Sequence, residues 1–112
     1  MKLVFIKEPL FFKDSKFQFN EEFQKAFNKP KDIVKNELNK MVIIYPKNSQ
    51  LIEDFFYTLF MEGMYNLNTV NQNNNDIFSF LISLDNTLIK VIPISLSRNH
   101  NDELEILIEL FK

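Results

Sequence analysis

The sequence has no cysteine and no tryptophan, and it contains one glycine, one histidine and one arginine. Without cysteine there can be no disulfide, no thiolate nucleophile and no cysteine metal site. One glycine cannot make the Gly-rich loops that bind phosphates or dinucleotides. One histidine excludes a multi-histidine metal site. We therefore expect no cofactor and no metal, and we do not expect an enzyme.

His100 is the one imidazole available to a catalytic site, and it lies in a polar segment between Arg98 and Asp102. A catalytic interpretation would pair these three side chains, with His100 as the base. Polar segments of this kind are far more often solvated turns. We therefore predict a turn residue, and a small enzyme of unknown class stays open as an alternative.

Long apolar runs are also missing. The N-terminal run ends at Glu8 and Pro9 before the apolar core of a signal peptide could form. No stretch approaches the roughly 18 apolar residues that span a bilayer. We expect neither export nor a membrane partner, and the absence of cysteine favours a reducing, cytoplasmic location.

The 112 residues suffice for a single domain, residues 1–112. A chain of this length buries about two-thirds of its unfolded surface, which leaves no room for a second core. Hydrophobic periodicity predicts an α+β fold. The expected sheet is mixed or antiparallel with about five strands, packed by one long amphipathic helix and two short helices in the order β-α-α-β-α-β-β-β.

Three segments are predicted to be helical. Asn20 can cap a short helix, and residues 32–39 are predicted as a second one. Over residues 48–67 apolar side chains recur every three or four positions, which predicts the long helix. Gly63 lies inside it at a cost of about 1 kcal/mol relative to alanine, and a close neighbour would explain its presence.

Five segments are predicted to be strands. The run 41–45 is continuously apolar and β-branched, as in a central strand covered on both faces. The Asn-rich tract 66–76 is predicted as an exposed loop. The expected strands are residues 2–6, 41–45, 77–84, 87–97 and 104–111.

Two of these strands are predicted to form a hairpin. Asp85 and Asn86 both tolerate the positive φ angles of a tight turn. Pro93 in the returning strand predicts a bulge or a sheet edge, because proline donates no ladder hydrogen bond. The turn would set two pairs of residues side by side, Ile89 with Ile82 and Val91 with Phe80.

The C-terminal segment alternates strictly, so that the even positions from Leu104 to Leu110 would face the core. A helix with Leu107 and Phe111 on its apolar side is the alternative. Eight residues of alternation favour the strand.

The segment from Leu10 to Phe19 is rich in phenylalanine but has no sustained period. Most of these aromatic side chains are expected to complete the core. An exposed remainder would mark a protein interface, where aromatic residues are enriched.

Charge is unevenly distributed along the chain. Residues 1–50 carry ten lysines against six acidic residues, whereas residues 51–112 carry three basic residues against nine acidic ones. The lysines from Lys25 to Lys40 could form a basic face for nucleic acid. The net charge of -2 and the single arginine argue against it, so we expect no nucleic-acid partner.

A protein partner is the remaining expectation, and the acidic residues are its candidate contacts. A solvated strand face is the plainer interpretation of these carboxylates. We interpret the chain as a bacterial immunity or antitoxin-like inhibitor. It would neutralise a toxin by binding it directly through an acidic surface. A homo-oligomeric structural or adaptor protein, such as a homodimer, is the alternative. The predicted partner-binding residues are Asp102, Glu103, Glu105 and Glu109.

Overall fold

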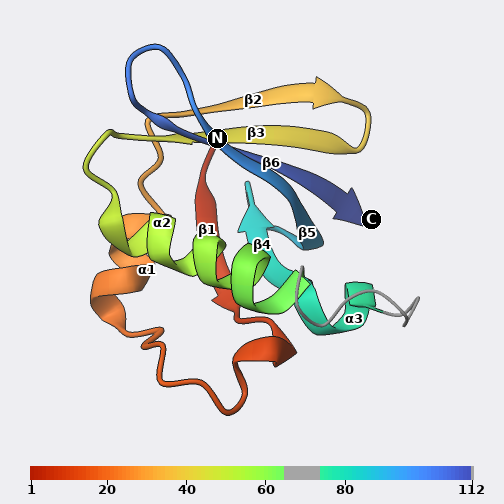
Figure 1. Cartoon of the computed structure of the whole chain (residues 1–112). Coiled ribbons are helices and arrows are strands. Elements are labelled where there is room, and N and C mark those ends of the chain that lie inside the picture. Colours follow the sequence, from red (N-terminus) through yellow and green to blue (C-terminus); the bar gives the residue numbers. More distant parts are fainter. Residues whose placement is uncertain (65–73, 112) are drawn as a thin grey trace.

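Six strands form one antiparallel sheet in the order β1-β4-β5-β6-β3-β2 in the computed structural model, which describes residues 1–64 and 74–111 (Figure 1). The strands are β1 (Leu3–Lys7), β2 (Asp32–Glu37), β3 (Lys40–Tyr45), β4 (Phe80–Leu84), β5 (Thr87–Arg98) and β6 (Leu104–Phe111). The described helices are α1 (Glu21–Phe27), α2 (Gln50–Tyr57) and α3 (Asn74–Phe78), with a 3-10 helix at Leu10–Phe12 and a π-helix at Thr58–Met64. The α+β prediction is confirmed.

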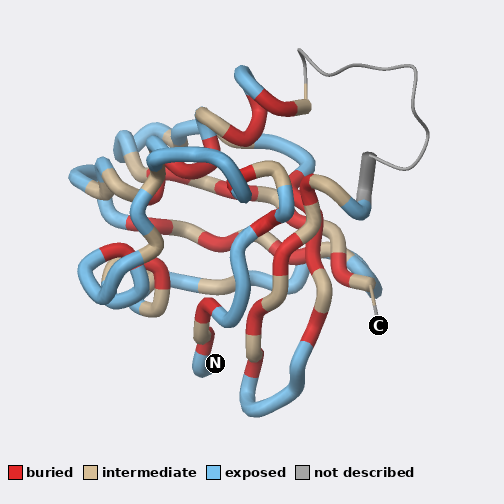
Figure 2. The backbone as a smooth tube through the Cα atoms, turned by 90° about the horizontal axis from the view of Figure 1, so that it is seen from below, coloured by how far each residue is buried: buried red, intermediate tan, exposed pale blue. Residues whose placement is uncertain are grey.

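The core lies between the sheet and the helices α1 and α2. Helix α2 and the π-helix that continues it cross in front of β1 and β4, and α1 lies beside α2 (Figure 1). Buried and half-buried residues alternate along β3, β4 and β6, and Figure 2 shows the burial of each residue along the backbone. We call the face under α1 and α2 the inner face, and the opposite one the outer face.

The predicted short helix at residues 32–39 is wrong, because this segment forms β2 and a turn to β3. Ile33 and Val34 are β-branched, and β3 offers them a hydrogen-bonding edge in register with Ile43 and Val42. Pairing with this edge is a tertiary interaction, so the local helix and strand propensities of residues 32–39 do not account for it. The sheet consequently has six strands rather than about five.

The first helix and its cap are confirmed. Asn20 precedes α1, and its side-chain oxygen accepts a hydrogen bond of 3.0 Å from the backbone N–H of Phe23. Phe23 and Phe27 are buried. At the end of the helix, the carbonyl of Phe27 accepts a hydrogen bond of 2.5 Å from the Tyr45 hydroxyl, and burial raises the pKa of that hydroxyl well above its ordinary value.

The long helix is confirmed as far as residue 64. It continues from α2 into the π-helix and buries side chains that the periodicity placed on its apolar face. The close neighbour expected for Gly63 exists, because a Cβ atom there would lie 2.8 Å from a ring carbon of Phe78. The predicted helical residues 65–67, and residues 66–73 of the predicted loop 66–76, lie outside the described residues. For residues 74–76 the loop prediction is wrong, because they begin α3.

A short helix replaces the start of one predicted strand. Residues 77–84 were expected to be extended, but Ile77 and Phe78 belong to α3 and β4 begins at Phe80. Phe78 is nevertheless fully buried. Its ring lies beside Phe11, at a centroid distance of 5.7 Å, so the helical conformation also places this side chain in the core.

The hairpin of β4 and β5 is confirmed in its turn and register. Asp85 and Asn86 have φ angles of 49° and 70°. Pro93 precedes a shift of register against β6, so it marks a bulge in a central strand. The two predicted residue pairs, Ile82 with Ile89 and Phe80 with Val91, are partners in the ladder.

The C-terminal strand is confirmed as β6, which pairs with β5 and β3 in the middle of the sheet. Its even positions from Leu104 to Leu110 are buried. Strand β3 is also paired on both sides. The prediction that both faces of β3 are covered is only partly confirmed, because Val42 and Ile44 remain partly exposed on the outer face.

The Phe-rich segment packs on the core, as predicted. Phe12 is 4% exposed, and Phe17 and Phe19 are partly buried against the same cluster. Phe55 of α2 lies among these rings, with centroid distances of 5.5 Å to Phe12 and 5.7 Å to Phe19.

Sheet order mixes the two oppositely charged halves of the chain. The three central strands β4, β5 and β6 come from the acidic half, and strands of the basic half flank them on both sides. Lys31 of the basic half consequently pairs with Glu103 of the acidic half. The charge separation along the sequence therefore does not by itself give one acidic face.

Candidate functional site

The turn between β5 and β6 holds the first two of the four predicted contact residues. Asn99 organises this turn, because its side-chain oxygen accepts hydrogen bonds from the backbone N–H groups of Asn101 and Glu103, at 2.9 and 3.0 Å. Asp102 has a φ of 62°, a conformation that aspartate tolerates better than most residues. The backbone that carries the side chains of Asp102 and Glu103 therefore has one defined conformation.

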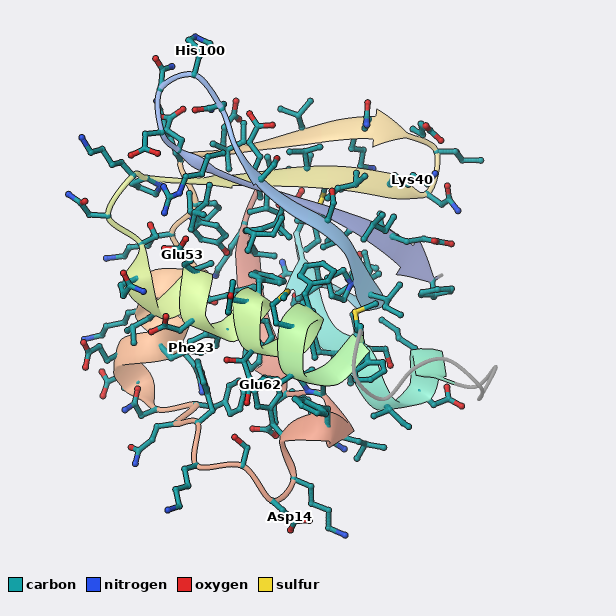
Figure 3. The ribbon with its side chains drawn as sticks, in the orientation of Figure 1. Asp14, Phe23, Lys40, Glu53, Glu62 and His100 are labelled. Atoms are coloured by element: carbon teal, nitrogen blue, oxygen red, sulfur yellow. The ribbon has the colours of Figure 1, made fainter. Side chains whose placement is uncertain are left out.

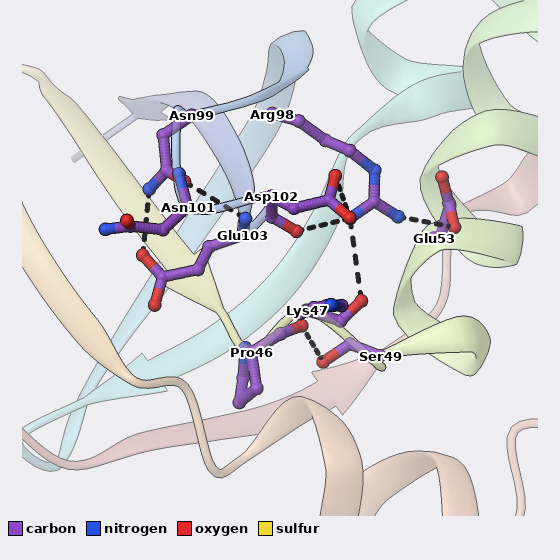
Figure 4. Close-up of polar contacts among 9 residues, drawn as sticks. All are labelled: Pro46, Lys47, Ser49, Glu53, Arg98, Asn99, Asn101, Asp102 and Glu103. Atoms are coloured by element: carbon purple, nitrogen blue, oxygen red, sulfur yellow. Dashed lines mark hydrogen bonds and ion pairs between the residues drawn. The ribbon is translucent and has the colours of Figure 1, made fainter.

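Arg98 connects this turn to the beginning of α2 (Figure 4). Its guanidinium donates to the Glu53 carboxylate at 2.9 Å and to the backbone carbonyl of Asp102 at 2.6 Å. The Asp102 carboxylate lies 3.5 Å from the same guanidinium. Asp102 therefore already has a cationic partner within the chain, a role for Arg98 that sequence reasoning did not find.

Glu103 also has partners within the chain. Lys31 donates to one carboxylate oxygen, and the side-chain amide of Asn99 donates to the other at 2.9 Å. The hydrogen bond from Lys31, and next that from Asn99, hold the pKa of Glu103 below its ordinary value. Glu103 joins the turn to the segment before β2.

We expect Glu103→Gln to reduce the acid sensitivity of the fold. A carboxylate with a lowered folded-state pKa stabilises the protein above its unfolded pKa of about 4.3, and this stabilisation is lost as the pH falls through the folded-state value. The unfolding midpoint in urea, measured between about pH 6 and pH 3, should fall less in Glu103→Gln than in the native chain. Glu22→Gln on α1 is the control, and equal slopes in all three proteins would contradict the prediction.

Glu105 and Glu109 lie elsewhere, on the outer face of the sheet. They alternate with the buried residues of β6 and flank Leu107, which shares their face. Both are half-buried. Among the described residues, neither carboxylate has a hydrogen bond or an ion pair. The structure therefore does not bring the four predicted residues into one cluster, since two are paired in the turn and two are unpaired on the sheet.

Glu105 and Glu109 each have one apolar and one polar neighbour across the sheet, and on the β5 side these neighbours are Ser97 and Ile92, respectively. Ladder pairing places Ile44 directly across from Glu105, Val42 across from Leu107, and Lys40 across from Glu109. Sequence reasoning missed these apolar residues, because it assigned the run 41–45 to a strand covered on both faces. The sequence signal that could have indicated an apolar outer face is Leu107, an apolar residue between Glu105 and Glu109.

His100 lies at the tip of the turn, pointing away from the helices (Figure 3). It is exposed, and within residues 1–64 and 74–111 it has no hydrogen-bonding or ionic partner. Arg98 and Asp102 pair with each other instead. Within the described residues, His100 is therefore not positioned against a second polar group, and no group of three or more potential ligands for a metal occurs there.

A small hollow of about 250 Å³ lies between the helical layer and β5. It is open to solvent, and its lining within the described part of the chain offers no carboxylate, imidazole or amine for acid–base chemistry. Its lining residues are Tyr57, Phe60, Met61, Ser95 and Leu96.

Comparisons with other proteins do not assign the chain to a family. None of its described helices is both long and apolar enough to span a membrane. Searches of protein-family models, curated proteins and solved structures found no match.

Proposed function

We propose that this chain is a protein-binding module whose contact surface is the outer face of its sheet. The observation that carries the proposal is the asymmetry of the sheet. Its inner face is closed by α1, α2 and the Phe-rich segment, whereas apolar residues such as Val42 and Leu107 remain partly exposed on the outer face. Clustered apolar side chains on a surface are typical of interaction sites.

Within this class we propose an inhibitor, of the kind that bacterial immunity and antitoxin proteins represent, acting in the cytoplasm. Such an inhibitor neutralises a toxin by covering its active surface. Nuclease toxins have basic active surfaces that bind phosphates, and the unpaired carboxylates of Glu105 and Glu109 have the complementary charge. Asp102 and Glu103, the other two predicted contact residues, pair with Arg98 and Lys31, so they add little to this negative charge.

The test is a pull-down of the tagged protein from the cells that encode it. We expect one protein to co-purify at a stoichiometric yield, and that protein should inhibit growth when it is produced without this chain. A co-purifying protein with no toxicity would remove the inhibitor assignment and leave the binding module. Recovery of this chain alone would contradict both.

The homo-oligomer is the second candidate, and the unpaired edge of β2 is the observation in its favour. Strand β2 is the last in the sheet, and Val34 is 45% exposed on it. The same strand carries Asp32, Lys35 and Glu37, and charges on an edge strand discourage pairing between copies. We therefore place the homo-oligomer second, and sedimentation of the purified protein distinguishes a monomer from a dimer.

A further inference from the structure

We infer that the outer face around Leu107 binds a protein surface that has an apolar centre with lysine or arginine side chains on both sides of it. The inference rests on the proposed protein-binding function, and it specifies the contact residues and the chemistry of the partner. The docking surface consists of Val34, Val42, Ile44, Glu105, Leu107 and Glu109.

The centre of the docking surface is apolar across three strands. Leu107 of β6 pairs in the ladder with Val42 of β3, and Val42 pairs with Val34 of β2. Residues paired in this way point to the same face of a sheet and lie side by side. Val42 and Leu107 are half-buried, and Val34 is 45% exposed. A partner can therefore cover a continuous apolar row without any rearrangement of the sheet.

Two unpaired negative charges flank this row. Glu105 and Glu109 are each two residues from Leu107 on the same face, about 7 Å along the strand in each direction. The nearest cation by register is Lys40, and its ammonium group pairs with Glu37 at 3.7 Å. Throughout the described ranges, no protein group donates to either flanking carboxylate.

Burial of these carboxylates determines the chemistry of the partner. In the free protein water solvates both charges, and a docked surface would remove much of that water. Removing water from a carboxylate is strongly unfavourable unless a cation or a hydrogen-bond donor replaces it. An entirely apolar or an acidic partner would leave Glu105 and Glu109 unsatisfied. A partner with a lysine or arginine at each side would satisfy both.

A second copy of this chain fits the surface poorly. In a face-to-face dimer the two-fold axis lies in the plane of the interface. An axis along β6 through Leu107 places Glu105 against Glu105 of the other copy, and an axis across β6 places Glu105 against Glu109. Both arrangements bring like charges together as they lose water, which is unfavourable. The pattern therefore favours a different, basic protein.

The experiment measures the affinity of the co-purifying protein for the double variant Glu105→Gln/Glu109→Gln by calorimetry at low and high salt. Glutamine keeps the shape and removes the charge. We expect the affinity to fall by about tenfold or more at low salt, and its salt dependence to become weaker. The matched control, Glu22→Gln/Glu62→Gln, changes the net charge equally on the helical side and should stay within about twofold of the native chain.

A third variant, Leu107→Asp, tests the apolar centre and should abolish binding. The aspartate would lie half-buried between Glu105 and Glu109 and should lower stability, so binding is measured under conditions in which circular dichroism shows the native fold. Native affinity in both outer-face variants would overturn the inference together with the outer face as the contact surface, whereas the protein-binding role itself would stand, because the partner still binds. A dimer in sedimentation that Leu107→Asp dissociates would show that the occupant is a second copy. Failure to recover any partner would overturn the proposed function together with the inference.

Discussion

Phe55→Ala should lower the free energy of unfolding by about 3–5 kcal/mol, the range for a fully buried phenylalanine replaced by alanine. Phe55 has no exposed surface and lies at the centre of the aromatic core. Its ring centroid is 4.7 Å from that of Phe56, 5.3 Å from Phe23 and 5.4 Å from Phe80. The substitution removes contacts to the Phe-rich segment, α1 and β4 together, and the surrounding rings cannot fill the cavity.

Urea unfolding monitored by circular dichroism measures this loss. Tyr57→Ala is the control on the same helix, because Tyr57 is 58% exposed and its truncation should cost much less. Phe55→Leu should give an intermediate value, since leucine fills part of the cavity. A loss in Phe55→Ala no larger than that in Tyr57→Ala would contradict the central position of this ring.

Gly63→Ala should also destabilise the protein, by about 1–3 kcal/mol, although alanine is the better helix former. The propensity gain is about 1 kcal/mol at most. The new methyl group would lie 2.8 Å from a ring carbon of Phe78 and 3.4 Å from Phe11. Phe78 is fully buried, so its ring has little room to move. The free-energy cost of overpacking therefore exceeds the gain in helix propensity.

A double-variant cycle distinguishes this clash from a general helix effect. Phe78→Leu shortens the neighbour, so the double variant Gly63→Ala/Phe78→Leu should lose less stability than the sum of its two single variants. Glu62→Ala, on an exposed neighbouring position, should change the unfolding midpoint little. Additive losses, or a stabilised Gly63→Ala, would show that the close approach to Phe78 is not what requires glycine.

Elements with a strong local signal were predictable from the sequence. The cap at Asn20, the apolar face that includes Phe55, the turn at Asp85-Asn86 and the alternation of β6 each depend on neighbours close in the chain. Such signals survive folding because tertiary contacts reinforce them. The ladder register of β4 and β5 follows from the turn alone, which is why it was predicted to the residue.

Residues 32–39 show where local reasoning fails. Ile33 and Val34 fit a helix with one apolar side as well as they fit a strand, and Asp32 suits a helix cap. The edge of β3 decides between the two, and β3 is itself held in the sheet by pairing with β6 on its other side. Hydrogen bonding to an available edge outweighs the small differences in propensity of β-branched residues.

The candidate site, like the fold, was only partly predictable from the sequence. The sequence supplied the four acidic residues, but their charges are not equivalent in the fold. Asp102 and Glu103 are neutralised by Arg98 and Lys31, and Lys31 is distant from Glu103 in the chain. Pairings at such separations cannot be read from spacing. The apolar neighbours of Glu105 were equally hidden, because they belong to another strand.

The sequence by itself determined the α+β class, the positions of the capped and alternating elements, and the absence of motifs for phosphate loops, thiol chemistry and multi-histidine metal sites. Periodicity and composition are local properties, so they can be read without a fold. Tertiary structure alone decided the sheet order, the conversion of residues 32–37 into β2, and which carboxylates keep a free charge. Each of these depends on contacts between segments far apart in the chain, and their free energy exists only when the sheet has formed.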